Sequence, residues 1–150
     1  MAQVIVISDT SPISGLLQIG RMELLQQVFG KIIVPPVVDT EIRKLKGFSI
    51  DISSYTTAAW VEIVSPNSHG RVQQFMQKLD AGESEAIVFA LEQGADLLLI
   101  DERAGNNIAL AEGLTTIGLI GVLVKAKESG HVKKSCSEIR YFLNIDIVLA

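Results

Sequence analysis

Short β-branched apolar runs alternate with helical segments along this chain, and this alternation restricts its fold more than any other feature. Each run is closed by Asp, Pro, Ser or Gly and is too short for a helix. Strands separated by helices pair in parallel, with helices on both faces of the sheet. We therefore expect a three-layer α/β/α fold with a central parallel sheet of four to five strands. The expected strands are residues 4–8, 31–34, 60–64, 96–100 and 115–117.

The segments between these runs have helical spacing and recognisable helix ends. Pro12 fits the first turn of a helix with Thr10 or Ser11 as a possible cap, and Asp80 is placed to cap a helix that Gly94 ends. Residues 48–57 are the least regular part and fit a loop with a short helix. The other expected helices are residues 21–29, 36–47, 72–79, 103–112, 121–128 and 135–143, and residues 145–149 form a last extended piece.

The size and composition of the chain exclude several classes of protein. Its 150 residues fit a single domain, residues 1–150. No apolar run approaches the roughly 20 residues that cross a bilayer, and no basic segment precedes the first apolar run as in an export signal. The lone Cys136 cannot form an internal disulfide, which fits a reducing compartment. We expect a cytoplasmic protein with no membrane association.

Acidic residues directly follow two of the expected strands. Asp9 closes the first strand, and Asp101 closes the fourth. The ligand crevice of a parallel sheet lies at the carboxyl ends of the strands, where the strand order reverses. If these two strands are neighbours, both carboxylates enter one crevice. Glu41 and Glu83 lie on helices that begin at the same edge and are placed to join them.

Glu83 has to be distinguished from Glu85, because both lie in the first turns of one expected helix. Two positions correspond to about 200° around a helix, so these two side chains cannot share a face. The face of Glu83 continues through small and apolar residues that suit packing on the sheet. Glu83 is therefore the better candidate, and Glu85 is left as a supporting acid.

Four converging carboxylates repel one another unless a cation neutralises them. Oxygen ligands without His or Cys favour Mg²⁺ or Mn²⁺, and such an ion activates water and stabilises charge on a phosphoryl group. The set Asp9, Glu41, Glu83 and Asp101 thus predicts phosphodiester hydrolysis. Taken singly, each acid has a plainer explanation: the two aspartates cap helices, Glu41 is a solvated helix acid, and Glu83 favours a helix N-terminus.

The charge balance agrees with a nucleic acid partner once these four acids are set aside. Acids number 17 and bases 13, so the four candidate acids account for the whole excess of negative charge. Arg43, Lys44 and Arg103 lie close to candidate acids in the sequence and are placed to contact a nucleic acid backbone. We expect these three residues to bind substrate.

Four stretches of the sequence together resemble a PIN domain: SDTSPI, VPPVVDTEI, AGESEAIVFALEQGADLLLIDERAG and LTTIGLIGVLVKAKESG. The closest branch is similar to the prokaryotic VapC-type toxins of toxin–antitoxin pairs, over roughly residues 4–148. The resemblance implies a metal-dependent endoribonuclease that uses Mg²⁺ or Mn²⁺. It places Asp9, Glu41, Glu83 and Asp101 on the catalytic, metal-binding acidic quartet.

The same resemblance implies supporting residues and partners. Thr10 or Ser11 corresponds to a small hydroxyl residue that supports the first aspartate, and Glu102 is an auxiliary acid. RNA, an antitoxin protein and a second copy of the chain are the expected partners. Glu83 stands where the branch more often has Asp, and Asn106 and Asn107 stand where a basic residue is common. A PIN-fold module that binds RNA or protein without cutting therefore remains the alternative.

Overall fold

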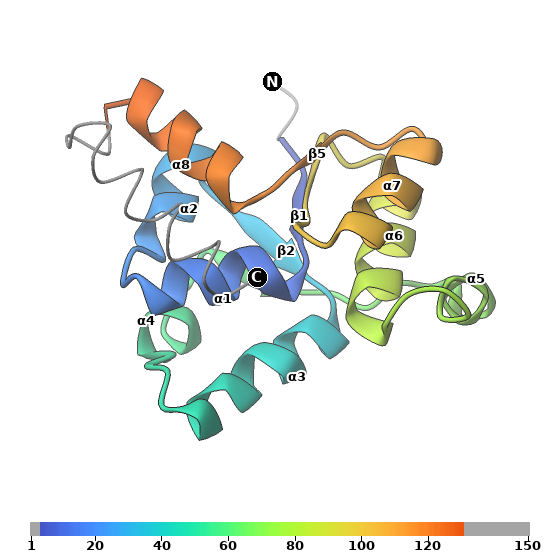
Figure 1. Ribbon diagram of the computed structural model, residues 1–150, viewed down its shortest axis with the longest axis horizontal. Coiled ribbons are helices and arrows are strands. Elements are labelled where there is room, and N and C mark those ends of the chain that lie inside the picture. The colour runs from blue at the N-terminus through green and yellow to red at the C-terminus, as the bar shows by residue number, and fades with distance from the viewer. Residues whose placement is uncertain (1–3, 131–150) are drawn as a thin grey trace.

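The structure is a computed structural model that describes residues 4–130 (Figure 1). Within these residues five parallel strands form one sheet in the order β3-β2-β1-β4-β5. Every strand lies inside its predicted run, so the fold class is confirmed. The strands are β1 (Val6–Ser8), β2 (Ile32–Val34), β3 (Val61–Ile63), β4 (Leu97–Leu99) and β5 (Thr116–Ile117).

The strand order reverses at β1, which is the centre of the sheet. β1 pairs with β2 on one side and with β4 on the other, with Ser8 opposite Leu99. The pairing continues beyond β1, since the Asp9 amide donates to the Leu99 carbonyl oxygen at 2.8 Å. The two strands that precede Asp9 and Asp101 are therefore neighbours, as their common crevice requires.

The helices follow the sequence pattern closely. α1 begins at Thr10, directly after β1, and α6 begins after its N-cap residue Asp80. Gly94 ends α6, as predicted, and it adopts the left-handed conformation with φ of 59°. The helices are α1 (Thr10–Gln18), α2 (Glu23–Phe29), α3 (Pro36–Lys44), the 3-10 turn η1 (Leu45–Phe48), α4 (Ser53–Thr56), α5 (His69–Phe75), α6 (Ala81–Gln93), α7 (Arg103–Ala111) and α8 (Leu119–Glu128).

Four predicted helix starts are wrong, including that of α2, which begins at Glu23 and not at residue 21. Neither Thr10 nor Ser11 caps α1, because Asp9 occupies the N-cap position. α5 begins at His69, three residues before the predicted start. α8 begins at Leu119, two residues early, because the Asp101 carboxylate accepts a hydrogen bond from the Leu119 amide at 2.9 Å and completes the first turn. The segments predicted at residues 135–143 and 145–149 lie outside the described residues.

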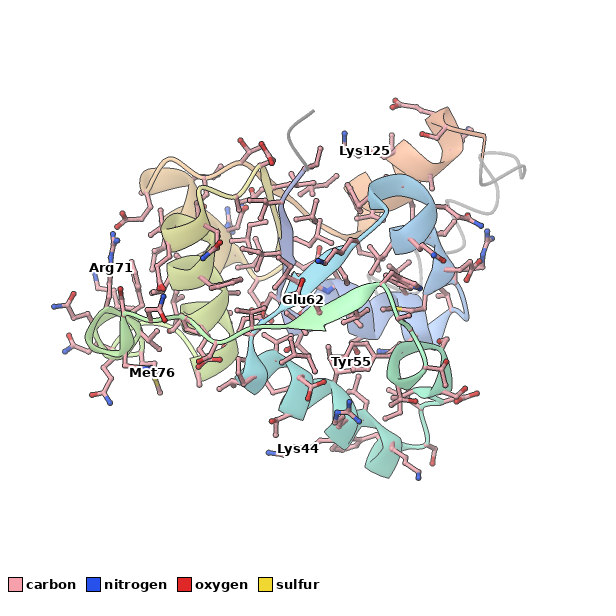
Figure 2. The ribbon with its side chains drawn as sticks, turned by 180° about the vertical axis from the view of Figure 1, so that it is seen from behind. Lys44, Tyr55, Glu62, Arg71, Met76 and Lys125 are labelled. Atoms are coloured by element: carbon pink, nitrogen blue, oxygen red, sulfur yellow. The ribbon has the colours of Figure 1, made fainter. Side chains whose placement is uncertain are left out.

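Two apolar layers enclose the sheet, and alternate residues of each strand supply them. Val6 and Leu99 face a core shared with α1, α2, α3, α4 and α8, whereas Ile7 and Leu98 face a core shared with α6 and α7. Figure 1 shows these two groups of helices on opposite sides of the strands. β3 is an edge strand, and Figure 2 shows it from behind, with Glu62 on its exposed side.

None of the helices between residues 4 and 130 combines the length and apolar character needed to cross a membrane.

Candidate active site

Asp9 is buried at the carboxyl end of β1, with 3% of its surface exposed. It holds the N-cap position of α1, but its side chain makes no capping hydrogen bond. Capping therefore does not explain why a carboxylate stands here. The pKa of the Asp9 carboxyl is raised to about 7, mainly by burial and in smaller part by the charges of Asp80, Glu41 and Glu102, against a hydrogen bond from the Thr10 amide that lowers it.

Glu41 reaches the same edge from the second turn of α3. Its carboxylate accepts a hydrogen bond from the Thr10 hydroxyl, which fixes the side chain from the neighbouring helix. The carboxylate also lies against Gly82, where a Cβ atom would stand 2.9 Å from both of its oxygens. Thr10 thus supports Glu41, whereas the resemblance implied that it would support the first aspartate.

Glu83 lies in the first turn of α6 and is also buried, with 6% of its surface exposed. Its carboxylate rests on Gly105 at the start of α7, where a Cβ atom would come within 2.6 Å of Oε2. The pKa of Glu83 is raised to about 8, first by burial and then by a side-chain hydrogen bond to Asp80 and the charges of Asp80, Asp9 and Glu102. The protein therefore holds two carboxyls in surroundings that disfavour their charged forms.

Asp80 is a further member of this site, although its position in the sequence predicted only a helix cap. It does cap α6, since its Oδ1 accepts a hydrogen bond from the Glu83 amide at 2.8 Å. Its charge also acts on Asp9 and Glu83. The three-residue spacing from Asp80 to Glu83 could have indicated that Asp80 lies close to the site, because it places a capping side chain over the first turn of its helix. We call Asp9, Glu41, Asp80, Glu83 and Glu102 the acidic cluster.

Asp101 stands beside the acidic cluster but is engaged with α8. One of its carboxylate oxygens accepts a hydrogen bond from the Leu119 amide and lies against Gly118. The neighbouring Glu102 contributes its charge to both buried acids. The structure thus brings Asp9, Glu41 and Glu83 together and places Asp101 at the rim, bound to a helix N-terminus.

Glu85 lies on a different side of α6 from Glu83, as their angular separation predicts. Its carboxylate accepts a hydrogen bond from the Val37 amide in the first turn of α3, at 3.0 Å. This contact satisfies a free amide of α3 and complements the positive end of its dipole. Glu85 therefore supports the helix that carries Glu41.

The predicted substrate-binding cations stand in different environments. Arg103 lines a groove of about 710 Å³ beside the acidic cluster, together with Thr10, Ser11 and Glu102. Lys44 is exposed on α3. Arg43 bonds to Asp39 at 3.0 Å and stacks over Tyr55, so its charge is partly neutralised within the protein.

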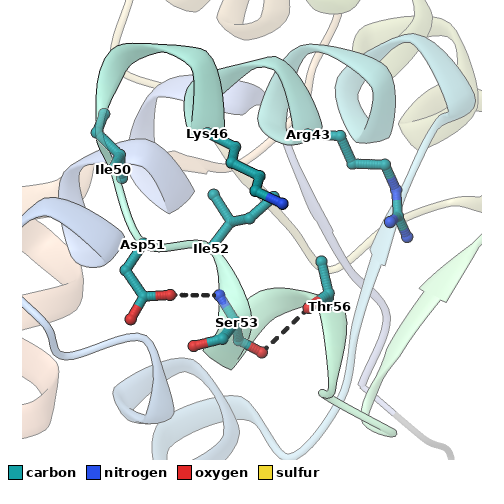
Figure 3. A pocket seen from close by; sticks show the side chains of 7 residues that line it. All are labelled: Arg43, Lys46, Ile50, Asp51, Ile52, Ser53 and Thr56. Carbon is teal, nitrogen blue, oxygen red and sulfur yellow. Dashed lines mark hydrogen bonds between the residues drawn. The ribbon is translucent and has the colours of Figure 1, made fainter.

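Arg43 also lines a second cavity, of about 530 Å³, at the other end of α3. Figure 3 shows Arg43 and Lys46 on one side of it and Ser53 and Thr56 on the other. The Asp51 carboxylate is bonded to the Ser53 amide at 2.9 Å. This cavity shares no lining residue with the groove beside the acidic cluster.

Comparisons with known proteins agree with this architecture. A family model described as a PIN domain matches residues 5–146. A PilT N-terminus domain protein, SSO1118, from the hyperthermophilic archaeon Sulfolobus solfataricus P2 superposes with a TM-score of 0.57 at 22% identity, over 82% of this chain and 93% of its own. PAE2754 from Pyrobaculum aerophilum superposes with a TM-score of 0.58 at 13% identity, over 84% of this chain and 97% of its own. No curated protein sequence matches the chain.

Proposed function

The chain belongs to the PIN domain family, and we propose that it is a divalent-metal-dependent endoribonuclease that hydrolyses RNA phosphodiester bonds at its acidic cluster. PIN domains generally carry nuclease activity and use divalent ions. The observation that carries the proposal is the burial of Asp9 and Glu83 among further acids at the point where the strand order reverses. Such uncompensated negative charge is what a bound cation neutralises.

The chemistry of the cluster fits Mg²⁺ or Mn²⁺. Its donors are carboxylate oxygens, and Gly82 and Gly105 leave space in which the Glu41 and Glu83 carboxylates sit. Within residues 4–130, no three acidic, His or Cys side chains already stand at metal-binding spacing.

The protein residues take distinct roles in this proposal. Asp9, Glu41 and Glu83 hold the ion, with Asp101 at the rim of the site, and Glu102 is an auxiliary acid. The ion supplies water activation and charge stabilisation at the phosphoryl group. Arg103 and Lys44 contact the RNA backbone, since Arg103 lines the groove beside the cluster and Lys44 is an exposed cation at the end of the helix that carries Glu41. Arg43 is proposed with them, although Asp39 holds its guanidinium.

A direct test is incubation of single-stranded RNA with the purified chain and Mg²⁺ or Mn²⁺, with and without EDTA. We expect internal cleavage only when the ion is free to bind, and renewed cleavage when the ion is restored in excess. Calorimetric titration with Mn²⁺ should show binding by the parent chain. Cleavage that EDTA leaves unchanged would contradict the proposal.

The engagement of Asp101, whose carboxylate accepts a hydrogen bond from the Leu119 amide, favours a second function, a PIN-fold module that binds RNA or protein without cutting. The same experiments separate the two. A module of this kind would bind the RNA but show no Mn²⁺ binding and no cleavage in any of the ions. An antitoxin protein that restrains the enzyme, a homodimer and a cytoplasmic location complete the proposal, by analogy with the toxin-like branch that the sequence resembles.

Thr10→Val provides a test of how the site is held. We expect cleavage to slow by about ten-fold, because loss of a hydrogen bond to a metal-binding carboxylate typically costs this much. Thr10→Ser keeps the hydroxyl and should restore most of the rate. Cleavage rates for the three chains at saturating Mn²⁺ measure the effect, and equal rates for parent and Thr10→Val would show that the contact is unimportant.

A further inference from the structure

The groove beside the acidic cluster runs between α1 and the N-terminal turn of α8. Its volume of about 710 Å³ lies within the usual range of small-ligand sites. At its inner end it meets the cluster through Thr10 and Glu102, with Arg103 beside them. A molecule bound at the cluster can therefore extend into this groove without leaving the protein surface.

The outer part of the groove is lined by uncharged residues and has two unlike walls. Ser14 and Gln18 form a polar wall on α1, where the Gln18 amide donates to the Ser14 hydroxyl at 3.1 Å. Leu119 and Ile120 form an apolar wall on α8, and 41% of the Ile120 surface is exposed. The lack of a side chain at Gly15 keeps the two helices close, since a Cβ there would stand 2.5 Å from Leu119 Cδ2.

We propose that this outer groove binds the base of the nucleotide next to the cleaved phosphate in single-stranded RNA, and that Gln18 selects which base is accepted. The inference rests on the proposed nuclease function and names a specificity residue for it. A nucleobase has apolar faces and a polar edge, which match the Ile120 wall and the Gln18 amide. A side-chain amide offers both donors and an acceptor, so it discriminates between base edges.

The position of the groove and its charges favour a base over a phosphate. Lining cations are confined to the inner end, where Arg103 stands, so the backbone is held there and the uncharged outer part is left for the base. From Thr10 to Gln18, α1 rises by roughly 12 Å. This span suits one nucleotide adjacent to the reacting phosphate.

The first test maps cleavage positions in a single-stranded RNA library with all four bases at each position. We expect the parent chain to show a preference at one position beside the cut, and Gln18→Ala to reduce that preference by about ten-fold. Gln27→Ala is the matched control, because Gln27 is an exposed glutamine on α2 and does not line the groove. Identical base preference in parent and Gln18→Ala overturns the inference.

The second test does not require cleavage. Each of the four nucleoside 5′-monophosphates is titrated into the parent chain without metal, and backbone amide shifts are followed by NMR. We expect shifts at Ser14, Gln18 and Ile120 that differ among the four bases and vanish in Ser14→Phe, whose ring fills the groove. Absence of such shifts overturns the inference even if RNA is cleaved. Groove shifts in a chain that cleaves no RNA would support the base site and refute only the nuclease proposal.

Discussion

Asp9→Asn should reduce metal-dependent RNA cleavage by more than about a hundred-fold, because loss of a group that only orients a metal ligand already costs roughly 10–100-fold. Asn has the shape of Asp but lacks its negative charge, so the cluster loses affinity for a divalent ion. The measurement is the initial rate of cleavage of one RNA at several Mn²⁺ concentrations. Calorimetry on the same variant should show weakened Mn²⁺ binding.

The variant should at the same time be more stable than the parent in the absence of metal. The Asp9 carboxyl has a pKa near 7, so above that pH the folded parent holds a charge that burial disfavours. Asp9→Asn removes this charge, and we expect the free energy of unfolding at pH 8 in EDTA to rise by roughly 2 kcal/mol. A well-folded Asp9→Asn chain that cleaves RNA at the parental rate would refute the assignment of this site.

Asp96→Asn is a matched control, since Asp96 also borders β4 but at the amino-terminal end of the strand, opposite to the acidic cluster. Its carboxylate accepts the Ile5 amide at 2.7 Å, away from the acidic cluster. We expect this change to leave cleavage and Mn²⁺ binding near the parental values. A comparable loss of cleavage in both variants would indicate a general effect of removing acids from the sheet ends.

The fold was predictable because the apolar pattern of each strand and the signals that begin the following helix agree with each other. The run 4–8 is β-branched and is followed by Asp9 and a Pro-containing first turn, so the strand end and the helix start coincide. The same holds at residues 96–103, where β4, Asp101 and α7 succeed one another. The predicted helix boundaries were wrong where a residue distant in the sequence determines them. The start of α8 is an example, because the Asp101 carboxylate, from another loop, accepts a hydrogen bond from the Leu119 amide.

The site was only partly predictable, because strand order sets which residues meet and helix faces set how far each side chain reaches. The periodicity of α6 separates Glu83 from Glu85 without a structure. It cannot show that Thr10 bonds to Glu41 across two helices, or that Asp80 adds its charge to the buried pair. Those contacts depend on the packing of α1, α3 and α6 around one end of β1.

Lowering the pH should stabilise the metal-free protein, and this is the second large effect that we expect. Both buried carboxyls have raised pKa values, so the folded chain binds more protons than the unfolded chain. Their contribution is fully present below the unfolded pKa values of 3.8 and 4.5. It is lost as the pH rises to about 7 for Asp9 and about 8 for Glu83. Urea unfolding in EDTA between pH 5 and pH 8 measures this decline.

Mn²⁺ should reverse the decline, since an ion bound to the folded chain neutralises the same charges and stabilises it by mass action. The gain should be largest near pH 8, where both carboxylates are ionised, and small near pH 5, where protons compete with the ion. In Asp9→Asn the pH dependence between 5 and 7 should weaken, leaving the part due to Glu83. Asp51 does not interfere, because its lowered pKa confines its effect to more acidic solutions. A stability that rises from pH 5 to pH 8 in EDTA would mean that these two acids are not held in the surroundings described.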